Sequence, residues 1–553
     1  MRNTSRFTKK SFLRLIALML AVLTVFSGCG KSETAGEGET EIAVPVSTPE
    51  PQPITGGEVK MYIPTNADIT DPLKVNTEEM LNFFSMIYES LVSISADGKL
   101  TAELAENWFT EDGGKTWNIK IREWVTWHGH DISLTSRDII LTFERLKTIG
   151  EDSYYAYCVN TIDTIEAVDN QNIKVTMKNG GYASLYALTF PVMLSGEATA
   201  KPVGTGPYVY DGYRDSGILL RANEAWWKQR PYIDSFLFIE RDSNDVALAS
   251  YSAGQLDMVP TSSTTVGKYR QEGITIVQDV MTQSVEIMLV NSTSNALSDV
   301  RVRQAIAYGL DRSKIISNIY MNRAQSCDVP VAPDSWIYDS ASKLYDYNAS
   351  KALALLSDAG WTDVDDDGRL EKGGMALTEL NLMLLANDST DSARKNAAAA
   401  IAEQLGELGI NVEVVTAAYT VGQTEGEYME MLKNGEYDIA LIGLNLGRDS
   451  NLTEVMSSNG SANYGNYYDY ELDTLAGSMM SAGDEAAYRD AASAFQLAFA
   501  EKLPFIPLYF RLNSIVYSAD IKGMTDVREP DIMRSVDKWY MFTDGDNINT
   551  TGH

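Results

Sequence analysis

The chain contains few of the residues that most hydrolases use for catalysis. Its 553 residues include 3 cysteines and 3 histidines, and one of these histidines is the last residue, His553. No His-Glu-x-x-His motif and no Gly-x-Ser-x-Gly motif occurs. General acid–base chemistry would therefore fall to carboxylates, which are numerous. The residue counts therefore leave a secreted hydrolase open, as a remote alternative that would rely on carboxylates.

Positive charge is also scarce. Lys and Arg together number 45 against 76 Asp and Glu, which gives a formal net charge of −31. Binding to nucleic acid phosphates needs a basic face, so nucleic acids are excluded as partners. The acidic residues are spread along the whole chain and predict a soluble body with a solvated surface.

Long apolar runs are absent except near the N-terminus. Residues 15–26 are apolar but too short to cross a bilayer, and basic residues precede them. This pattern predicts a signal peptide over residues 1–29. Small residues lead into Cys29, which resembles the lipobox of bacterial lipoproteins and implies lipidation of Cys29. The alternative is a secreted protein with an incidental Cys29. Residues 30–57, rich in Pro, Gly, Ser, Thr and Glu, predict a disordered tether.

Two cysteines remain in the predicted folded body, Cys158 and Cys327. Outside the cell they could form a disulfide, and as buried free thiols they would need no partner. Both alternatives stay open from the sequence. Their spacing matches no metal-binding pattern.

Residues 380–450 give the clearest structural signal. Strand-like segments at 380–386, 410–414 and 437–443 alternate with two helix-like segments, and glycines follow the helices. This alternation predicts right-handed crossovers and a mostly parallel sheet. Such sheets bind ligands outside the carboxyl ends of their strands. Residues 444–450 are therefore the first candidate for a binding surface.

Several blocks, in order along the chain, are similar to those of one protein family. Together they resemble extracellular solute-binding proteins of the peptide/nickel class (family 5), which serve ABC importers and include oligopeptide- and dipeptide-binding lipoproteins. The blocks are residues 104–146, 202–208 (PVGTGPY), 223–232, 251–258, 300–312 (VRVRQAIAYGLDR), 345–361 and 506–510 (IPLYF).

The resemblance implies an α/β fold of the two-lobed periplasmic-binding-protein type (type II, cluster C), with an inserted subdomain and a ligand cleft between the lobes. Lobe I would comprise residues 58–290 and 512–545, with the inserted subdomain at about 99–199. Lobe II would comprise residues 291–511. The chain would cross between the lobes near residues 289–292 and 509–513, and hinge closure would trap the ligand.

The implied function is capture of a solute, first of all an oligopeptide or dipeptide, and its delivery to the ABC permease without chemistry or a cofactor. The same fold could bind a non-peptide solute or a signalling peptide. The expected protein is a monomer at the outer face of the cytoplasmic membrane, anchored by lipid.

Peptide binders of this family pair the ligand's amino terminus with an aspartate in the loop that matches residues 444–450. Here Leu444 takes the position of a family tryptophan and Gly447 takes that of the aspartate. Asp449 either replaces the missing carboxylate or is a solvated loop residue. Arg448 and Arg511 could instead bind a carboxylate. Further candidate ligand contacts are Thr65, Asn66, Trp336, Asn445 and Tyr509.

Two patterns suggest metal sites. Asp363, Asp365 and Asp367 imitate the first half of a calcium loop, but Gly374 stands where that loop needs glutamate, so a solvated turn is the alternative. His128 and His130 could share one side of a strand, but no third ligand follows them. No resident metal is therefore expected.

Overall fold

The protein is described from a computed structural model, which covers residues 53–195, 201–215, 217–373, 377–388, 392–419 and 426–542. These residues belong to one compact unit, Gln52–His553. The signal peptide, Cys29 and most of the predicted tether lie outside the described residues, as does Gly374. No helix in the described ranges is both long and apolar enough to span a membrane.

Two small sheets build the first part of the chain. In the first, β1 runs parallel to β10, and β9 and β8 continue the sheet in antiparallel order. The second sheet is antiparallel and lies inside the predicted inserted subdomain. The first comprises β1 (Glu58–Pro64), β10 (Ser235–Arg241), β9 (Gly217–Ala222) and β8 (Tyr208–Arg214), and the second β4 (Ala105–Phe109), β5 (Thr116–Ile121), β7 (Asn172–Met177) and β6 (Ile162–Ala167).

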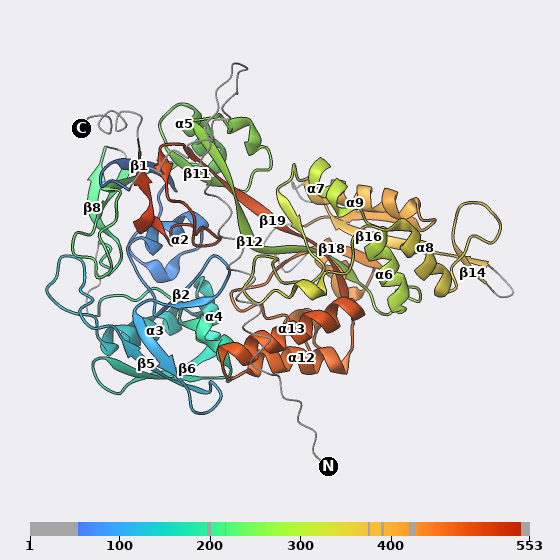
Figure 1. The fold of residues 1–553 in the computed structure, drawn as a ribbon, viewed down its shortest axis with the longest axis horizontal. Coiled ribbons are helices and arrows are strands. Elements are labelled where there is room, and N and C mark those ends of the chain that lie inside the picture. The colour runs from blue at the N-terminus through green and yellow to red at the C-terminus, as the bar shows by residue number, and fades with distance from the viewer. Residues whose placement is uncertain are drawn as a thin grey trace, which may run out of the picture. The chain divides into compact units, whose positions relative to one another are not determined.

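A seven-stranded mixed sheet extends through the other half. Its strand order is β11-β19-β12-β18-β16-β17, and β13 pairs with β19. Figure 1 shows the two longest strands, β12 and β19, running side by side from β11 to β18. The strands are β11 (Met258–Thr261), β12 (Thr275–Val290), β13 (Ala324–Ser326), β16 (Asn381–Asn387), β17 (Asn411–Ala417), β18 (Ile439–Asn445) and β19 (Phe505–Ser518).

The expectation for residues 380–450 is confirmed for three strands and needs a correction for the sheet. β16 is parallel to both β17 and β18. Helix α10 (Glu427–Asn434) ends at Gly435, whose φ of 70° is the left-handed conformation that glycine adopts without strain. The sheet as a whole is not mostly parallel, because β18 joins antiparallel β12, and β19 and β11 continue that pattern.

Helices cover the sheets. Around β16 and β18, the helices α6, α8 and α9 close one hydrophobic core, to which Ile306, Leu356, Ile401 and Leu384 belong. A larger core contains the first-half sheets and continues into α12 through Leu472 and into α13 through Tyr488. The helices of at least six residues are α2 (Glu78–Ser85), α3 (Ser136–Ile149), α4 (Ala156–Thr161), α5 (Asn244–Ser252), α6 (Val300–Gly309), α7 (Arg312–Asn318), α8 (Ala349–Asp358), α9 (Ser392–Gly406), α10, α12 (Tyr470–Ser481) and α13 (Glu485–Lys502).

The shorter elements are hairpins and single turns. They are β2 (Val92–Ile94), β3 (Leu100–Ala102), β14 (Glu371–Gly373), β15 (Leu377–Glu379), β20 (Ile521–Lys522), β21 (Tyr540–Met541) and α11 (Thr453–Met456), with 3-10 turns η1 (Pro72–Lys74), η2 (Gly150–Asp152), η3 (Tyr182–Leu188), η4 (Val266–Tyr269), η5 (Ser340–Ser342) and η6 (Val536–Lys538).

Cys158 and Cys327 are both free and buried. They therefore do not form the disulfide that the sequence left open. Burial raises the pKa of each thiol, to about 12 for Cys158. Both side chains act as small core residues.

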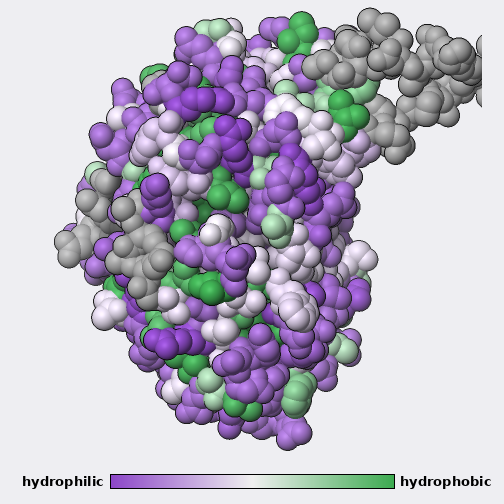
Figure 2. Space-filling view, turned by 90° about the vertical axis from the view of Figure 1, so that its left-hand side faces the viewer, coloured by the Kyte–Doolittle hydropathy of each residue, from purple (hydrophilic) through white to green (hydrophobic). Residues whose placement is uncertain are grey.

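The surface agrees with the acidic, polar composition. On the face shown in Figure 2, hydrophilic residues predominate, and apolar residues occur in small separate groups. Single exposed apolar side chains of this kind are normal for a soluble body.

Candidate functional site

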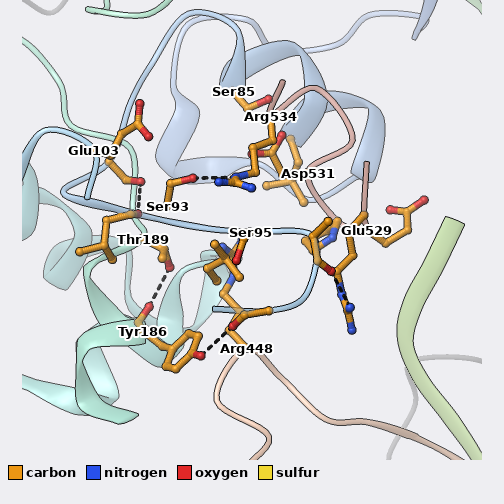
Figure 3. Close-up of a pocket in the computed structure, with 18 of the residues that line it drawn as sticks. Ser85, Ser93, Ser95, Glu103, Tyr186, Thr189, Arg448, Glu529, Asp531 and Arg534 are labelled. Carbon is orange, nitrogen blue, oxygen red and sulfur yellow. Dashed lines mark hydrogen bonds between the residues drawn. The ribbon is translucent and has the colours of Figure 1, made fainter. Parts of the chain in front are cut away.

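One large cavity lies among segments that are far apart in the sequence. It encloses about 1560 Å³ of space, part of which opens to solvent. Residues from α2 to β2, from η3, from the loop after β18, from α13 and from the C-terminal segment (residues 526–534) form its wall. Figure 3 shows these segments converging on the same space.

A tight turn after β18 directs the chain into this cavity. The Asn445 side-chain oxygen accepts a hydrogen bond of 3.0 Å from the Gly447 amide. Gly447 has a φ of 65°, which favours glycine at this position. The Leu446 amide donates to the Gln283 carbonyl, 3.1 Å away, and so ties the turn to β12. Arg448 consequently leaves the turn on the cavity side.

Arg448 connects this loop to the predicted inserted subdomain. Its guanidinium carbon lies 5.8 Å from the Tyr154 ring centroid and 5.9 Å from that of Tyr157. Cation–π contacts of this kind are stronger where water is excluded. Burial raises the pKa of the Tyr157 hydroxyl, so this ring stays neutral beside the cation.

Two aromatic side chains of the cavity wall, Trp336 and Tyr488, pack against each other and against Tyr182 behind them. Trp336 stacks on Tyr488 of α13, with ring centroids 5.9 Å apart and an angle of 28° between the planes. Tyr182 contacts both rings, at 6.3 Å and 5.7 Å. The Trp336 amide also donates to the Asp97 carbonyl at 2.9 Å. These contacts join the η3 region to residues that lie 150 or more positions later.

Glu89 is a buried carboxylate in the wall, surrounded by donors. Its oxygens accept hydrogen bonds from the Trp227 indole at 2.9 Å and 3.1 Å, from Trp226 at 3.3 Å and from the Thr205 hydroxyl at 2.8 Å. Burial, together with the nearby Glu103, raises the pKa of Glu89 well above its ordinary value. This carboxyl group has its hydrogen bonds supplied by the protein itself.

Residues 526–534 close the cavity from the C-terminal end of the chain. Arg534 donates to Asp526 at 2.8 Å and to the Ser93 hydroxyl at 3.1 Å. Arg528 donates to the Ala96 carbonyl at 2.7 Å and to Asp334 at 3.1 Å. Two arginines thus fix this segment against β2 and against the region of Trp336.

The comparisons with known proteins identify the family. The sequence model described as "Bacterial extracellular solute-binding proteins, family 5 Middle" matches residues 99–466. The chain belongs to this family. It is a two-lobed α/β solute-binding protein, and it is not an enzyme.

Its relatives cover most of the chain at low identity. The oligopeptide-binding protein AppA of Bacillus subtilis is 23% identical over 563 residues, which span 96% of this chain and 99% of the relative. The dipeptide-binding protein of Escherichia coli is 25% identical over 373 residues, or 62% and 66% of the two chains. The structure of HbpA2 from Haemophilus parasuis superposes with a TM-score of 0.75 at 17% identity and covers 88% and 100%.

Three of the ten ligand contacts predicted from the sequence line the cavity of this solute-binding protein: Trp336, Gly447 and Arg448. The others are placed as follows. Leu444, Asn445 and Asp449 belong to the same strand end and loop but not to the cavity wall, Tyr509 and Arg511 lie in β19, and Thr65 and Asn66 follow β1.

Tyr509 and Thr65 each have a contact that accounts for their position. Tyr509 is 1% exposed and packs on Tyr320 with ring centroids 4.8 Å apart, so it is a core residue here. The Thr65 hydroxyl donates to the Asp242 carboxylate at 2.6 Å on the surface. Contact of Tyr509 or Thr65 with a ligand stays a prediction, and it would need the two lobes to be arranged differently.

Asp449 uses its carboxylate within its own loop. One oxygen accepts a hydrogen bond of 3.2 Å from the Asn451 amide, and the Asp449 backbone carbonyl accepts one of 2.7 Å from the Tyr488 hydroxyl. Burial raises the pKa of this half-buried carboxyl group. The loop is thus anchored to α13, while the carboxylate turns toward the loop backbone.

The acidic turn brings one more carboxylate together than the sequence predicted. Oxygen atoms of Asp363, Asp365, Asp367 and the buried Glu371 all lie within 4.8 Å of one another. Glu371 also accepts a hydrogen bond of 2.9 Å from the Val364 amide, and Asp363 accepts one of 3.0 Å from Gly368. These bonds account for a solvated turn, and calcium binding stays the untested alternative.

His128 has a structural environment. Its Nε2 lies 2.9 Å from the Gly206 carbonyl oxygen, and burial lowers the pKa of the ring to about 4. The imidazole is therefore neutral and belongs to the turn beside residues 202–208.

No sequence pattern marks the wall residues of the C-terminal segment. Residues 526–534 carry five charged side chains without apolar periodicity, which reads as a surface loop. The available signal was the position of these charged residues, which follow the point where the chain is predicted to return to lobe I. Trp226 is buried, and it also lines the cavity.

Proposed function

We propose that this protein captures an oligopeptide or dipeptide in the cavity and delivers it to an ABC permease. The observation that carries the proposal is the composition of the wall, in which aromatic rings and charged groups from both predicted lobes face one space. A peptide has a polar backbone with charged ends, and pockets of this mixed character suit it. The names of the relatives add support.

Bonds across the cavity support a closing motion. Lys99 pairs with Glu485 at 2.7 Å, Arg528 pairs with Asp334 at 3.1 Å, and the Tyr182 amide donates to the Ala482 carbonyl. Each joins residues assigned to different lobes. A ligand would enter while these bonds are broken and would be enclosed once they form.

We place lobe I at residues 58–290 and 512–545, the inserted subdomain at about 99–199 and lobe II at 291–511. In this proposal β12 and β19 carry the hinge. Their pairing is irregular between Met281 and Val285, and the Thr282 hydroxyl bonds the Arg511 carbonyl at 2.8 Å. An interrupted ladder bends more easily than a continuous one, which favours a hinge earlier in β12 than residues 289–292.

The family is extracellular or periplasmic, and we propose attachment through a lipidated Cys29 and a tether over residues 30–57. The protein would act as a monomer beside its permease. Replacement of Cys29 by serine removes the residue that would carry the acyl chains, on which stable anchoring depends. The variant is therefore expected to move from the membrane fraction to the medium or periplasm. Immunoblotting of cell fractions measures this. A Cys29→Ser protein that stays with the membrane would contradict the lipid anchor.

Peptide binding is tested directly with purified protein. Mass spectrometry of copurifying small molecules, followed by titration calorimetry with the peptides found, is expected to show binding of one peptide per chain without cleavage. Trp336→Ala is expected to weaken binding at least about tenfold, because it removes a large apolar contact in the wall.

The chain offers a matched control for that substitution. Trp124 is 83% exposed and lies outside the cavity wall, so Trp124→Ala is expected to leave the affinity unchanged. Recovery of a non-peptide solute alone would redirect the proposal to that solute class. Cleaved peptide products would contradict a transport receptor.

A further inference from the structure

The charged residues of the cavity wall differ in whether they have partners within the protein. Arg534 and Arg528 bond Asp526 and Asp334, and Glu89 is surrounded by donors. Glu103 pairs with Lys228. These groups satisfy one another, so a ligand would have to displace existing bonds to use them.

Two carboxylates of the same wall retain free oxygen atoms. Among the described residues, no hydrogen-bond donor reaches Oε2 of Glu529 or Oδ1 of Asp531, and both atoms are buried. Glu529 is only 8% exposed. Its other oxygen, Oε1, accepts one bond of 3.2 Å from the Asn513 side chain. In Figure 3, Asp531 lies next to Ser85 of α2, and Glu529 belongs to the same segment.

Buried carboxylate oxygens without donors are unfavourable, because they lose the hydrogen bonds of water and gain none in return. Burial raises the pKa of both groups, to about 8 for Glu529. The carboxylates of Glu78 and Glu79 add to this effect at Glu529. At Asp531 the charges of Arg448 and Arg534 oppose the effect of burial. A cation placed here would supply the missing donors and offset the repulsion at Glu529.

We propose that Glu529 and Asp531 form the subsite for the ligand's primary ammonium group, the amino terminus of the bound peptide. This inference rests on the proposed function. It adds that the amino terminus is the end of the peptide that lies against the C-terminal segment. An ammonium group has three donors, which matches two carboxylates with free acceptors.

Arg448 supports the orientation. Its Nε is buried and makes no hydrogen bond to the described residues. It reaches the cavity from the loop after β18 (Figure 3), and its positive charge acts on Asp531 across the cavity. A peptide with its ammonium at Asp531 would place negative charge or carbonyl oxygens toward this guanidinium.

Asp449 is the alternative ammonium partner, and the structure disfavours it. Its carboxylate already accepts the Asn451 amide, and Asp449 is not part of the cavity wall. Single substitutions at Glu529 or Asp531 and at Asp449 therefore separate the two alternatives.

The test uses the full chain and two pools of random pentapeptides, one with free amino termini and one N-acetylated. The retained peptides are quantified by mass spectrometry. Wild-type protein is expected to retain the free-amino pool at least about tenfold better. Glu529→Gln and Asp531→Asn are each expected to reduce this preference to about twofold or less, while Asp449→Asn keeps the wild-type preference.

The thermal unfolding midpoint of the unliganded variants separates binding from structure. Removing a buried carboxylate with one oxygen that lacks a donor is expected to leave this midpoint unchanged or higher. A clear drop in both variants would assign the two residues a structural role and overturn the inference.

The remaining outcomes distinguish this inference from the proposed function. Retention of both pools without preference by the wild type would overturn the ammonium subsite and leave peptide binding intact. Loss of the preference in Asp449→Asn alone would move the subsite to Asp449. Retention of neither pool would overturn the peptide proposal, and this inference with it.

Discussion

Replacement of Arg394 by methionine is expected to lower the free energy of unfolding by about 3–5 kcal/mol, because it leaves a buried carboxylate without its cation. Glu286 of β12 is 4% exposed. Arg394 of α9 meets it with two parallel bonds, Nη2 to Oε1 at 2.8 Å and Nε to Oε2 at 2.9 Å. Burial alone would lower the pKa of Arg394, but the Glu286 charge raises it above its ordinary value, so the guanidinium stays protonated.

Gly443 of β18 makes room for this pair. A Cβ atom at that position would lie 2.9 Å from Arg394 Nη2. The geometry of this ion pair therefore depends on three elements, β12, β18 and α9. Urea unfolding followed by circular dichroism measures the effect.

A double variant and a neighbouring residue give the controls. Glu286→Leu combined with Arg394→Met is expected to recover most of the stability, since well-packed apolar residues replace buried ion pairs at little cost. Lys395 pairs with Asp388 at 3.0 Å, with both side chains about half exposed. Lys395→Ala is therefore expected to change the stability by no more than about 0.5 kcal/mol. An equal loss in the Lys395 and Arg394 variants would refute a special role of the buried pair.

The second large effect concerns pH. Between pH 5 and 8 the wild-type protein is expected to lose about 3–4 kcal/mol of stability that Glu529→Gln does not lose, since each pKa unit is worth about 1.4 kcal/mol. The folded-state pKa of Glu529 is raised to about 8 from an ordinary 4.5. In this range the folded protein holds a proton that the unfolded chain has released. Stability must then fall as the pH rises.

The cause is burial first, and then the charges around the carboxyl group. Glu78 and Glu79 face it from α2 and Asp531 lies on its own segment, while Asn513 of β19 donates the one hydrogen bond that opposes the shift. Unfolding free energies from urea titrations at several pH values give the slope for each variant. Glu224, with a side chain 73% exposed, supplies the control, and Glu224→Gln is expected to keep the wild-type slope. Parallel curves for wild type and Glu529→Gln would contradict this prediction.

Local patterns predicted what depends on neighbours in the sequence. The alternation at residues 380–450 yields β16, β17 and β18 in parallel, with Gly435 ending α10 as expected. The antiparallel strands β12 and β19 come from segments that begin near residues 275 and 505. Their pairing with β18 is long-range, and no local periodicity encodes it.

The same limit applies to the site. Arg448 and Trp336 were predicted because the family resemblance aligned their segments with a cleft. Glu529 and Asp531 have the appearance of surface acids in the sequence. Their burial follows only from the way residues 526–534 fold back over α2 and β2, where Arg534 bonds Ser93.

Because residues 526–534 are the last part of the cavity wall to be synthesised and exported, the binding site is incomplete until almost the whole polypeptide has left the ribosome and crossed the membrane. Up to that moment the nascent chain has no enclosed place in which to retain a solute. The order of the segments along the polypeptide thus delays ligand capture until export is nearly finished.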